Sequence, residues 1–533
     1  MAKVLFINPV VREEDVPVHI PYGIALLAAI AIRDGHLVQV YDENAWRKGE
    51  EVLSQVFDAD DWDIIGVGGI TTAYSSIKTI VRIAREKCPR AVITMGGGVL
   101  TSLPREMMTW LPQVDVGVIG EAFLTFPELC SMVDAGGRDF TRIAGTISRR
   151  PDGELVISKQ RDLLLDLDSL PYPAWDLFPV DEIYFQHSQM LFSEEGMLAS
   201  RRLDINASYG CSLICRFCYH LGISGDMRYE KGADGKIEVA FDKPGNYTRT
   251  IRYHSPEYIV RMAKHAYDKY GINFVGFLDE NLMTMDQYSG RTWMKEICRL
   301  WHEYGLAPQM KPDGTWTGVH WSGTSHATLC TKEILGIMRE AGCSHLVYGY
   351  ESFAPHVLKT IGKGATLQTN IRSFFWTLEA GIRPIPNQII GFPADDFDAL
   401  RMSMDAWKRL GIQVKPHFAT PYPGSEWFTV YRKSIEAQYN GDLEAFIIDL
   451  GDASRISAVI SHNFNAVELL GLRELMLKDD YKKIAEYEQI WRRNHNIPEG
   501  KPSTLLAERM TARSLRTPIK ANISSAALRV PAE

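Results

Sequence analysis

The chain has 533 residues, enough for about two or three domains, and 45% hydrophobic and 23% charged residues, as in an ordinary globular protein. Its net charge of −8 gives no general attraction for nucleic acid or for an anionic membrane. No apolar run reaches about 18 residues, so we expect no membrane span. The first residues read as a strand and not as a signal peptide. We therefore expect a cytoplasmic protein, in which clustered cysteines indicate metal binding or catalysis.

Residues 1–150 alternate short apolar runs with amphipathic helical stretches, which predicts a doubly wound parallel sheet of the Rossmann-like kind. The strand candidates are 3–10, 36–44, 63–71, 91–99 and 115–122. Ligands bind such sheets beyond the carboxyl ends of the strands. Glycines gather at three of these ends: Gly68, Gly69, Gly96, Gly97, Gly98 and Gly120. Tight turns are the simpler explanation for one pair, but three glycine-rich ends favour a ligand that approaches the backbone closely.

Three further regions follow. Residues 151–200 include a proline-rich stretch without periodicity and are predicted to be a linker. Residues 201–425 return to strand and helix alternation, which predicts a partial or complete β/α barrel with functional residues at the carboxyl ends of its strands. The strand candidates are 202–208, 272–281, 319–323, 345–352, 383–392 and 413–421. Residues 426–533 are predicted to be a helical region with a partly disordered tail from about 501.

The motif CSLICRFC contains three cysteines, Cys211, Cys215 and Cys218, directly after a predicted strand. Three thiolates on one tight loop are suited to three irons of a [4Fe-4S] cluster, with the fourth iron left open. A structural zinc site needs a fourth ligand at similar spacing. His220 is near, but a second pair of ligands is absent from the neighbouring sequence. The spacing therefore favours the iron-sulfur cluster.

This C-x3-C-x2-C motif, with the aromatic Phe217 before its last cysteine, resembles the signature of the radical S-adenosylmethionine superfamily. The resemblance implies that the open iron binds S-adenosylmethionine and that one electron from the cluster releases a 5′-deoxyadenosyl radical. Four more stretches resemble motifs of the same superfamily: FLDEN (277–281), GYES (349–352), IIGFP (389–393) and TPYPGS (420–425). By this resemblance, the cofactor-binding residues are Phe217, Tyr219, Asp279, Glu351, Ser352 and Gly391.

A doubly wound domain before such a barrel resembles the cobalamin-binding members of the superfamily, and the resemblance covers residues 1 to about 430. It implies that cobalamin is lined by Thr71, Thr72, Gly96, Gly97, Gly98, Gly120 and Glu121. Many cobalamin domains carry D-x-H-x-x-G, whose His binds cobalt from below. Here the stretch DVPVHIPYG has the wrong spacings. We therefore expect no His ligand to cobalt and a structural role for His19.

The resemblance implies an enzyme that methylates an unactivated carbon through the adenosyl radical and methylcobalamin. The alternative within the same family is an oxidative cyclase or ring-rearranging enzyme without methyl transfer. An RNA methylthiotransferase is disfavoured because the N-terminal domain holds only Cys88 and Cys130. A non-catalytic cobalamin or iron-sulfur carrier would not need the motifs FLDEN, GYES and IIGFP together.

The expected partners are a small-molecule or peptide substrate and an electron donor such as flavodoxin or ferredoxin, with no nucleic acid. Two segments are expected near the substrate: the aromatic stretch 311–323 over the barrel mouth and the long excursion 222–257. Trp316, Trp321, Tyr348 and Tyr350 either line that mouth or belong to the core.

Overall fold

The computed structural model describes residues 1–187, 190–191, 198–218, 227–232, 234–241 and 250–498. Its first sheet has the strand order β2-β1-β3-β4-β5-β6-β7. The first five strands are parallel and the last two antiparallel. The strands are β1 Lys3–Asn8, β2 Leu37–Asp42, β3 Ile64–Gly68, β4 Val92–Gly96, β5 Val116–Val118, β6 Thr146–Arg149 and β7 Leu155–Ile157. The predicted Rossmann-like sheet is therefore confirmed.

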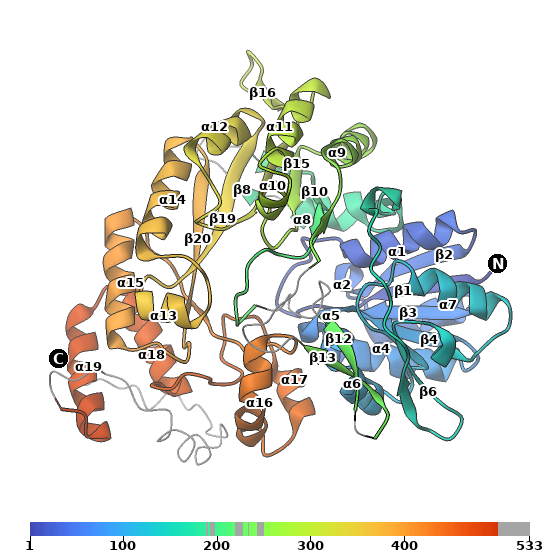
Figure 1. Cartoon of the computed structure of the whole chain (residues 1–533). Coiled ribbons are helices and arrows are strands. Elements are labelled where there is room, and N and C mark those ends of the chain that lie inside the picture. The colour runs from blue at the N-terminus through green and yellow to red at the C-terminus, as the bar shows by residue number, and fades with distance from the viewer. Residues whose placement is uncertain (188–189, 192–197, 219–226, 233, 242–249, 499–533) are drawn as a thin grey trace.

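Helices cover both faces of this sheet (Figure 1). One core contains Phe6, Val116 and residues of α1 and α7, and the other contains Ile65, Ile93 and residues of α3 to α6. Both faces are apolar because each strand of a doubly wound sheet is buried on two sides. The helices and short turns are α1 Tyr22–Arg33, α2 Glu43–Trp46, α3 Gly49–Asp58, η1 Thr71–Ala73, α4 Tyr74–Lys87, α5 Gly97–Ser102, α6 Pro104–Trp110, α7 Thr125–Asp134 and η2 Phe140–Arg142.

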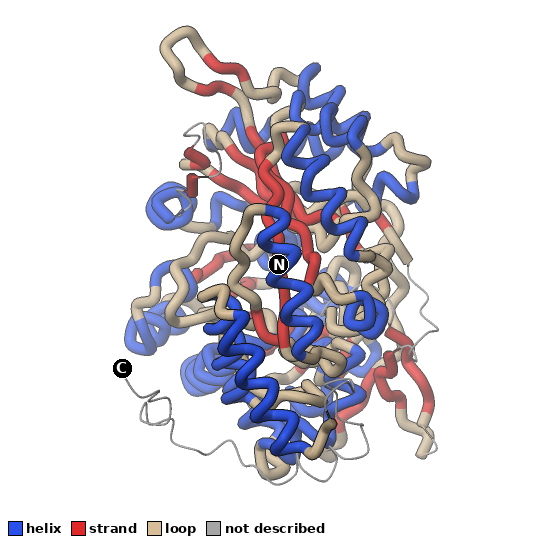
Figure 2. The backbone as a smooth tube through the Cα atoms, turned by 90° about the vertical axis from the view of Figure 1, so that its left-hand side faces the viewer, coloured by secondary structure: helices blue, strands red, loops and turns tan. Residues whose placement is uncertain are grey.

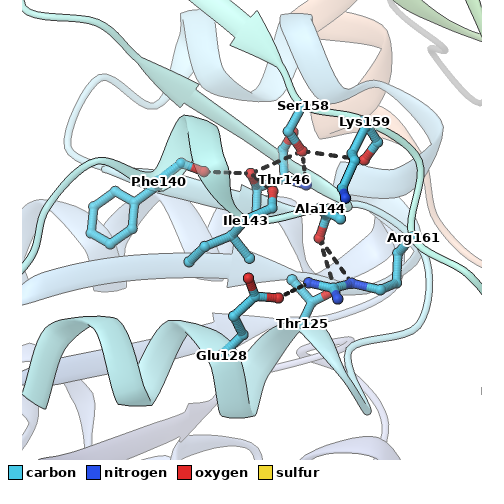
Figure 3. Close-up of polar contacts among 9 residues, drawn as sticks. All are labelled: Thr125, Glu128, Phe140, Ile143, Ala144, Thr146, Ser158, Lys159 and Arg161. Atoms are coloured by element: carbon cyan, nitrogen blue, oxygen red, sulfur yellow. Dashed lines mark hydrogen bonds and ion pairs between the residues drawn. The ribbon is translucent and has the colours of Figure 1, made fainter.

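The first sheet extends into the segment that the sequence predicted as linker, because β7 pairs with β6 across the turn at 150–154. Arg161 fixes the chain just after β7 to the first domain (Figure 3). Its guanidinium donates to Thr125 Oγ1 and to the Ala144 carbonyl, both at 3.2 Å, and it pairs with Glu128 of α7. The remaining elements before the barrel are short: η3 Leu167–Ser169, η4 Trp175–Leu177, η5 Val180–Tyr184, α8 Phe185–His187, β8 Met190–Leu191 and β9 Leu198–Ala199.

The second sheet is parallel and curled, with the strand order β10-β15-β18-β19-β20-β21. It is the predicted partial barrel, and Figure 2 shows its strands running side by side through the molecule. The strands are β10 Arg202–Ile205, β15 Phe274–Phe277, β18 His320–Ser325, β19 Cys343–Glu351, β20 Arg383–Ile390 and β21 His417–Phe418. The last strand is much shorter than the predicted 413–421, because Pro416 and Pro421 bracket it and lack the N–H that a sheet needs.

Helices between these strands form the outer layer of the half-barrel: α9 Pro256–Tyr270, α10 Thr284–Tyr288, α11 Trp293–Glu303, α12 Lys332–Glu340, α13 Pro355–Thr360, α14 Leu367–Glu379 and α15 Phe397–Leu410. Ser255 caps α9, which ends at Gly271 in the left-handed conformation. Thr331 caps α12, because its side chain accepts a hydrogen bond from the Ile334 N–H. Trp321, Tyr348 and Tyr350 are completely buried, so they belong to the barrel core and do not line its mouth.

The aromatic stretch 311–323 was expected over the barrel mouth, and this expectation was wrong. It includes β17 Trp316–Thr317, which pairs with β16 Gln309–Met310 in a hairpin at the top of Figure 1. The hairpin leads into the amino end of β18, so it lies at the end of the barrel opposite to the carboxyl ends of the strands. The aromatic composition of this stretch is visible in the sequence, but its location at the amino end of β18 is not.

Two excursions connect the barrel to the first domain. The short strands β11 Ser208–Tyr209 and β14 Arg252–Tyr253 pair with each other, as do β12 Met227–Lys231 and β13 Ile237–Phe241. The β12–β13 hairpin packs on the first domain, where Met227 and Tyr229 join its core and Arg105 pairs with Glu238 at 2.7 Å. The described part of the excursion 222–257 therefore bridges the two domains.

The C-terminal region is helical, as predicted: α16 Glu426–Gln438, α17 Leu443–Asp449, α18 Ala466–Leu477 and α19 Tyr481–His495. It packs on both domains. Phe428, Ile435 and Phe446 share a core with α4 to α6 of the first domain, whereas Leu469 and Trp491 join the barrel core. The predicted disordered tail lies outside the described residues. Within those residues, no helix has the length and hydrophobicity needed to cross a membrane.

Candidate cofactor sites

The three clustered cysteines lie on the loop that follows β10 and β11, at the carboxyl end of the first barrel strand. Cys211 and Cys215 are buried and Cys218 is half-buried. Burial raises the pKa of Cys211 to about 12, and Cys218 and Cys215 add to this effect because their thiolates would lie close by. Cys211 therefore favours the neutral thiol unless a cation stabilises its negative charge. Metal coordination supplies that stabilisation, because it deprotonates a bound thiol.

Contacts from the far side of the barrel fix the backbone of this loop. The Arg216 N–H donates to the Ile361 carbonyl at 3.0 Å, and the Trp427 N–H donates to the Arg216 carbonyl at 3.3 Å. The Arg216 side chain pairs with Glu426 of α16 at 2.5 Å. Phe217 packs against Phe392 and Trp427, with ring centroids 5.5 and 6.0 Å away. The loop is thus held between the turn after α13, the loop after β20 and α16 before any cofactor binds.

The arrangement differs from that of a site for a single metal ion. Among the described residues, no three His, Cys, Asp or Glu side chains converge as one ion requires. The thiolates of a [4Fe-4S] cluster each bind a different iron, so they need to surround a larger volume. Three cysteine thiols on one loop supply the type and number of protein ligands that such a cluster with one open iron would use. Tyr219, also predicted at this site, lies outside the described residues.

Asp279 lies at the carboxyl end of β15 and is 1% exposed. Its carboxylate accepts hydrogen bonds from the Ser208 hydroxyl and from the Ala207 N–H, the latter at 3.1 Å. Burial raises its pKa to about 7. Asp279 thus holds the strand that leads into the cysteine loop, and its predicted contact with a cofactor remains a prediction. Asn281, two residues on, is 2% exposed and has a buried Nδ2 without a partner among the described residues.

Glu351 lies at the end of β19 in a left-handed conformation, with φ +60°. This conformation is uncommon for a glutamate and persists only where its surroundings fix it. Its Oε1 accepts a hydrogen bond from Lys363 Nζ at 3.1 Å, and both side chains are less than a tenth exposed. Ser352 accepts from the Ala354 N–H at 3.2 Å, just before α13. Whether Glu351 and Ser352 contact a cofactor remains a prediction.

Gly391 follows β20 in a left-handed conformation, with φ +91°. Asp395 fixes this turn, because its Oδ2 accepts hydrogen bonds from the Gly391 and Phe392 N–H groups at 2.7 and 3.0 Å. Burial raises the pKa of Asp395 to about 7. The glycine motif is therefore closed by a buried carboxyl that the sequence interpretation did not single out.

In the first domain, the glycine-rich loops after β3 and β4 touch each other. A Cβ on Gly97, which has φ +84°, would lie 2.7 Å from the backbone of Gly69. A Cβ on Gly68 would lie 2.8 Å from the Gly96 carbonyl oxygen. Only glycine permits this approach. Gly98, the third glycine of this loop, lies in α5.

Thr71 and Thr72 form the turn directly after β3, between those loops and α4. Both side-chain hydroxyls are buried and have no hydrogen-bonding partner among the described residues. Buried hydroxyls are normally paired, so these two groups fit a ligand that supplies the missing partners. The polar tail of cobalamin, with its ribose, phosphate and amides, is such a ligand. The residues at this crevice therefore fit a cobalamin tail.

Glu121 forms an ion pair with the segment that precedes α9 of the barrel, and its predicted contact with cobalamin stays a prediction. It follows Gly120 at the end of β5 and pairs with Arg252 of β14, with both side chains less than a tenth exposed. Arg252 also donates to the Leu164 carbonyl at 2.7 Å and lies over the ring of Tyr209, just before the cysteine loop. One oxygen of Glu121, Oε2, remains buried without a partner among the described residues. This pair joins the carboxyl ends of the two sheets.

His19 provides a second bridge between the domains. Its Nδ1 lies 2.6 Å from Asp204 Oδ2 on β10, and Asp204 also pairs with Arg202 at 2.8 Å. Burial alone would raise the pKa of Asp204, but Arg202 and His19 outweigh it and lower the pKa. This contact gives His19 a structural role. The prediction that no His binds cobalt stays a prediction.

Sequence interpretation missed Lys363, Arg252, Asp395 and Asn281. Asn281 is the last residue of the motif FLDEN, and Asp395 follows the motif IIGFP by two residues. Both could therefore have been identified from their position in or beside a recognised motif. No motif contains Lys363 or Arg252. Their partners, Glu351 and Glu121, are 12 and 131 residues away in the sequence.

Comparisons with known proteins agree with this arrangement. The family described as B12 binding domain matches residues 9–130, and the Radical SAM superfamily matches residues 205–406. An uncharacterized methyltransferase from Pyrococcus horikoshii is 26% identical over 76% of this chain and 77% of its own length. An anaerobic magnesium-protoporphyrin IX monomethyl ester cyclase from Rubrivivax gelatinosus is 22% identical over 70% of this chain and 59% of its own length.

A similar fold occurs in a solved structure: the radical S-adenosylmethionine methyltransferase TsrM from Kitasatospora setae, with cobalamin and a [4Fe-4S] cluster bound. The TM-score is 0.61 at 17% identity, over 82% of this chain and 78% of that chain. At this identity the likeness concerns the fold.

Proposed function

Because the chain belongs to the cobalamin-binding radical S-adenosylmethionine enzymes, we propose that it methylates an unactivated carbon of its substrate. One observation carries the proposal: the carboxyl ends of the two sheets face one interface. Glu121 of the cobalamin domain reaches Arg252, which lies over Tyr209, two residues before Cys211. Two cofactors held at these ends are therefore close enough to act on the same substrate.

When bound, the cluster with S-adenosylmethionine supplies the radical, and cobalamin supplies the methyl group. The protein positions these groups and protects them. Cys211, Cys215 and Cys218 would hold the cluster, and Phe217 packs their loop against the barrel. The unpaired hydroxyls of Thr71 and Thr72 would bind the cobalamin tail. Burial of Cys211 and Cys215 keeps water from their thiols, and water would otherwise quench a radical by side reactions.

The substrate is proposed to be a small molecule or a peptide, which reaches the interface between the domains. The electron is proposed to come from a flavodoxin or ferredoxin, and the compartment is proposed to be the cytoplasm, where such donors and reduced thiols occur. The second candidate function is ring formation without methyl transfer. It is supported by the similarity to the cyclase from Rubrivivax gelatinosus, of which the alignment covers 59%.

Isotope labelling separates the two candidates. Anaerobic protein reconstituted with iron, sulfide and hydroxocobalamin is reduced and given S-adenosylmethionine with a labelled methyl group. We expect 5′-deoxyadenosine, S-adenosylhomocysteine and label on the bound cobalamin. The triple variant C211A/C215A/C218A loses 5′-deoxyadenosine formation, whereas Cys88→Ala, in the first domain, retains it. 5′-Deoxyadenosine without S-adenosylhomocysteine and without labelled cobalamin would favour the cyclase.

A further inference from the structure

A buried lysine lies beside the cysteine loop, and the proposed chemistry above does not use it. Lys363 follows α13, between two glycines in the left-handed conformation, Gly362 and Gly364. Its side chain is 9% exposed. Lysine is seldom buried to this extent unless its charge is paired. The position therefore requires an explanation.

The segment that carries Lys363 docks directly on the cysteine loop. The Ile361 carbonyl accepts from the Arg216 N–H at 3.0 Å, and a Cβ on Gly362 would lie 2.8 Å from the Ile214 carbonyl oxygen. On the other side, the Lys363 carbonyl lies 3.0 Å from His326 Nε2. Burial, with the nearby Lys363, lowers the pKa of His326 to about 3, so this imidazole is neutral and donates from Nε2. The backbone of Lys363 is thus fixed from both sides.

The ammonium group lies close to the cysteine loop. Nζ lies 5.9 Å from the centre of the Phe217 ring, and Phe217 stands between Cys215 and Cys218 in the sequence. Burial alone would lower the pKa of Lys363, but Glu351, Cys215 and Cys218 outweigh it and raise the pKa, so the group is charged. Among the described residues, Glu351 is the one hydrogen-bonding partner of Nζ, which has three N–H donors.

Two residues of the motif GYES, Gly349 and Glu351, lie next to the ammonium group of Lys363. A Cβ on Gly349 would lie 2.2 Å from Glu351 Oε1 and 2.9 Å from Lys363 Nζ, so any larger residue would displace the pair from this position. The left-handed backbone of Glu351 directs its carboxylate to the same place. A structural ion pair would not require a strained glutamate and a glycine beside a metal-binding loop. This convergence indicates that the position of the positive charge matters.

We propose that Lys363 sets the reduction potential of the cluster by stabilising its reduced, more negative state. The proposal rests on the proposed function, because it assumes a cluster on Cys211, Cys215 and Cys218. The step is a one-electron reduction from an external reductant such as dithionite, without transfer of a proton. Net charge near a cluster and its solvent exposure are among the factors that set its potential. A buried ammonium acts strongly because little water screens it.

The test is a redox titration of the reconstituted protein without S-adenosylmethionine, monitored by EPR of the reduced cluster. Lys363→Met is expected to lower the equilibrium constant for reduction at least about tenfold, a shift of about 59 mV to more negative potential for one electron. K363R keeps the charge and is expected to restore most of the potential. Lys359→Met, an exposed lysine on the preceding helix, is the matched control and leaves the potential unchanged.

The double variant K363M/E351Q removes both charges, so the potential rises again relative to K363M. If K363M fails to assemble a cluster, the K363R and double variants decide the question, since neither leaves a buried charge unpaired. Equal potentials in the wild type and in every cluster-containing variant would overturn the proposal. Failure of the proposed function is distinguishable, because the wild-type protein itself would then lack a cluster or fail to cleave S-adenosylmethionine.

Discussion

The buried carboxyl of Asp395 makes the stability of the barrel depend on pH. Burial raises its pKa to about 7, above the value of about 3.9 for an exposed Asp. Between these values the folded protein binds a proton that the unfolded chain has released, so stability falls as pH rises. The slope from this group reaches about 1.4 kcal/mol per pH unit between about pH 4 and 7.

The variant D395N carries no proton that can be lost. Denaturant unfolding at several pH values is therefore expected to give a weaker fall of stability with pH for D395N than for the wild type. Asp396, which caps α15, is the neighbouring position for comparison: asparagine also caps a helix, and D396N should keep the wild-type slope. An unchanged slope in D395N would show that Asp395 is ionised throughout this range.

At the same scale, His19 is expected to act on Asp204 and not on cobalt. EPR of the protein loaded with cob(II)alamin should show no superhyperfine splitting from an axial nitrogen, and His19→Ala should leave the spectrum and the cobalamin content unchanged. An axial-nitrogen pattern that disappears in H19A would contradict the assigned contact of His19 with the barrel.

Single residues also show where sequence interpretation ends. The cysteines, Glu351 and Gly391 could be found because each belongs to a short motif of fixed spacing. Lys363 and Arg252 could not, since neither motif nor periodicity tells which distant carboxylate will face a lysine or arginine. That depends on how the cysteine loop, the turn after α13 and the end of β5 come together in three dimensions.

At the scale of elements, the C-terminal hairpin of α16 and α17 is part of the first domain's core. Phe446 is completely buried, stacks on Phe428 at 6.3 Å and lies in the same core as Tyr74 and Ile77 of α4. Glu444 accepts hydrogen bonds from Tyr74 and Lys78 at 2.6 and 2.7 Å. The sequence predicted these helices but could not identify their partner, because an amphipathic face does not specify what covers it.

Phe446→Ala is expected to destabilise this contact by about 3–5 kcal/mol, as for other buried Phe truncations. The effect should reach α4, so its amide hydrogens should exchange faster in F446A. Val467→Ala, on the exposed face of α18, is the control and should leave α4 unchanged, since its side chain is 66% exposed. Faster exchange confined to α16 and α17 would contradict the shared core.

At the scale of the whole molecule, the sequence allows the prediction that a doubly wound sheet is followed along the chain by a β/α barrel. Apolar periodicity and strand-end glycines, on which this prediction rests, are local signals. The interface between the domains could not be predicted. It depends on Glu121 with Arg252, on His19 with Asp204, and on the β12–β13 hairpin, which join segments far apart in the sequence. These contacts bring together the carboxyl ends of the two sheets, where we propose that the two cofactors bind.

The measurement that tests this placement most directly is EPR of protein holding both cob(II)alamin and the reduced cluster. We expect that reducing the cluster broadens the cob(II)alamin signal and speeds its relaxation, because the two paramagnetic centres are proposed to lie at one interface. In C211A/C215A/C218A the cob(II)alamin signal should not respond to the reductant in this way. Cob(II)alamin and cluster signals that are each unaffected by the other, in protein shown to hold both cofactors, would contradict a shared active site.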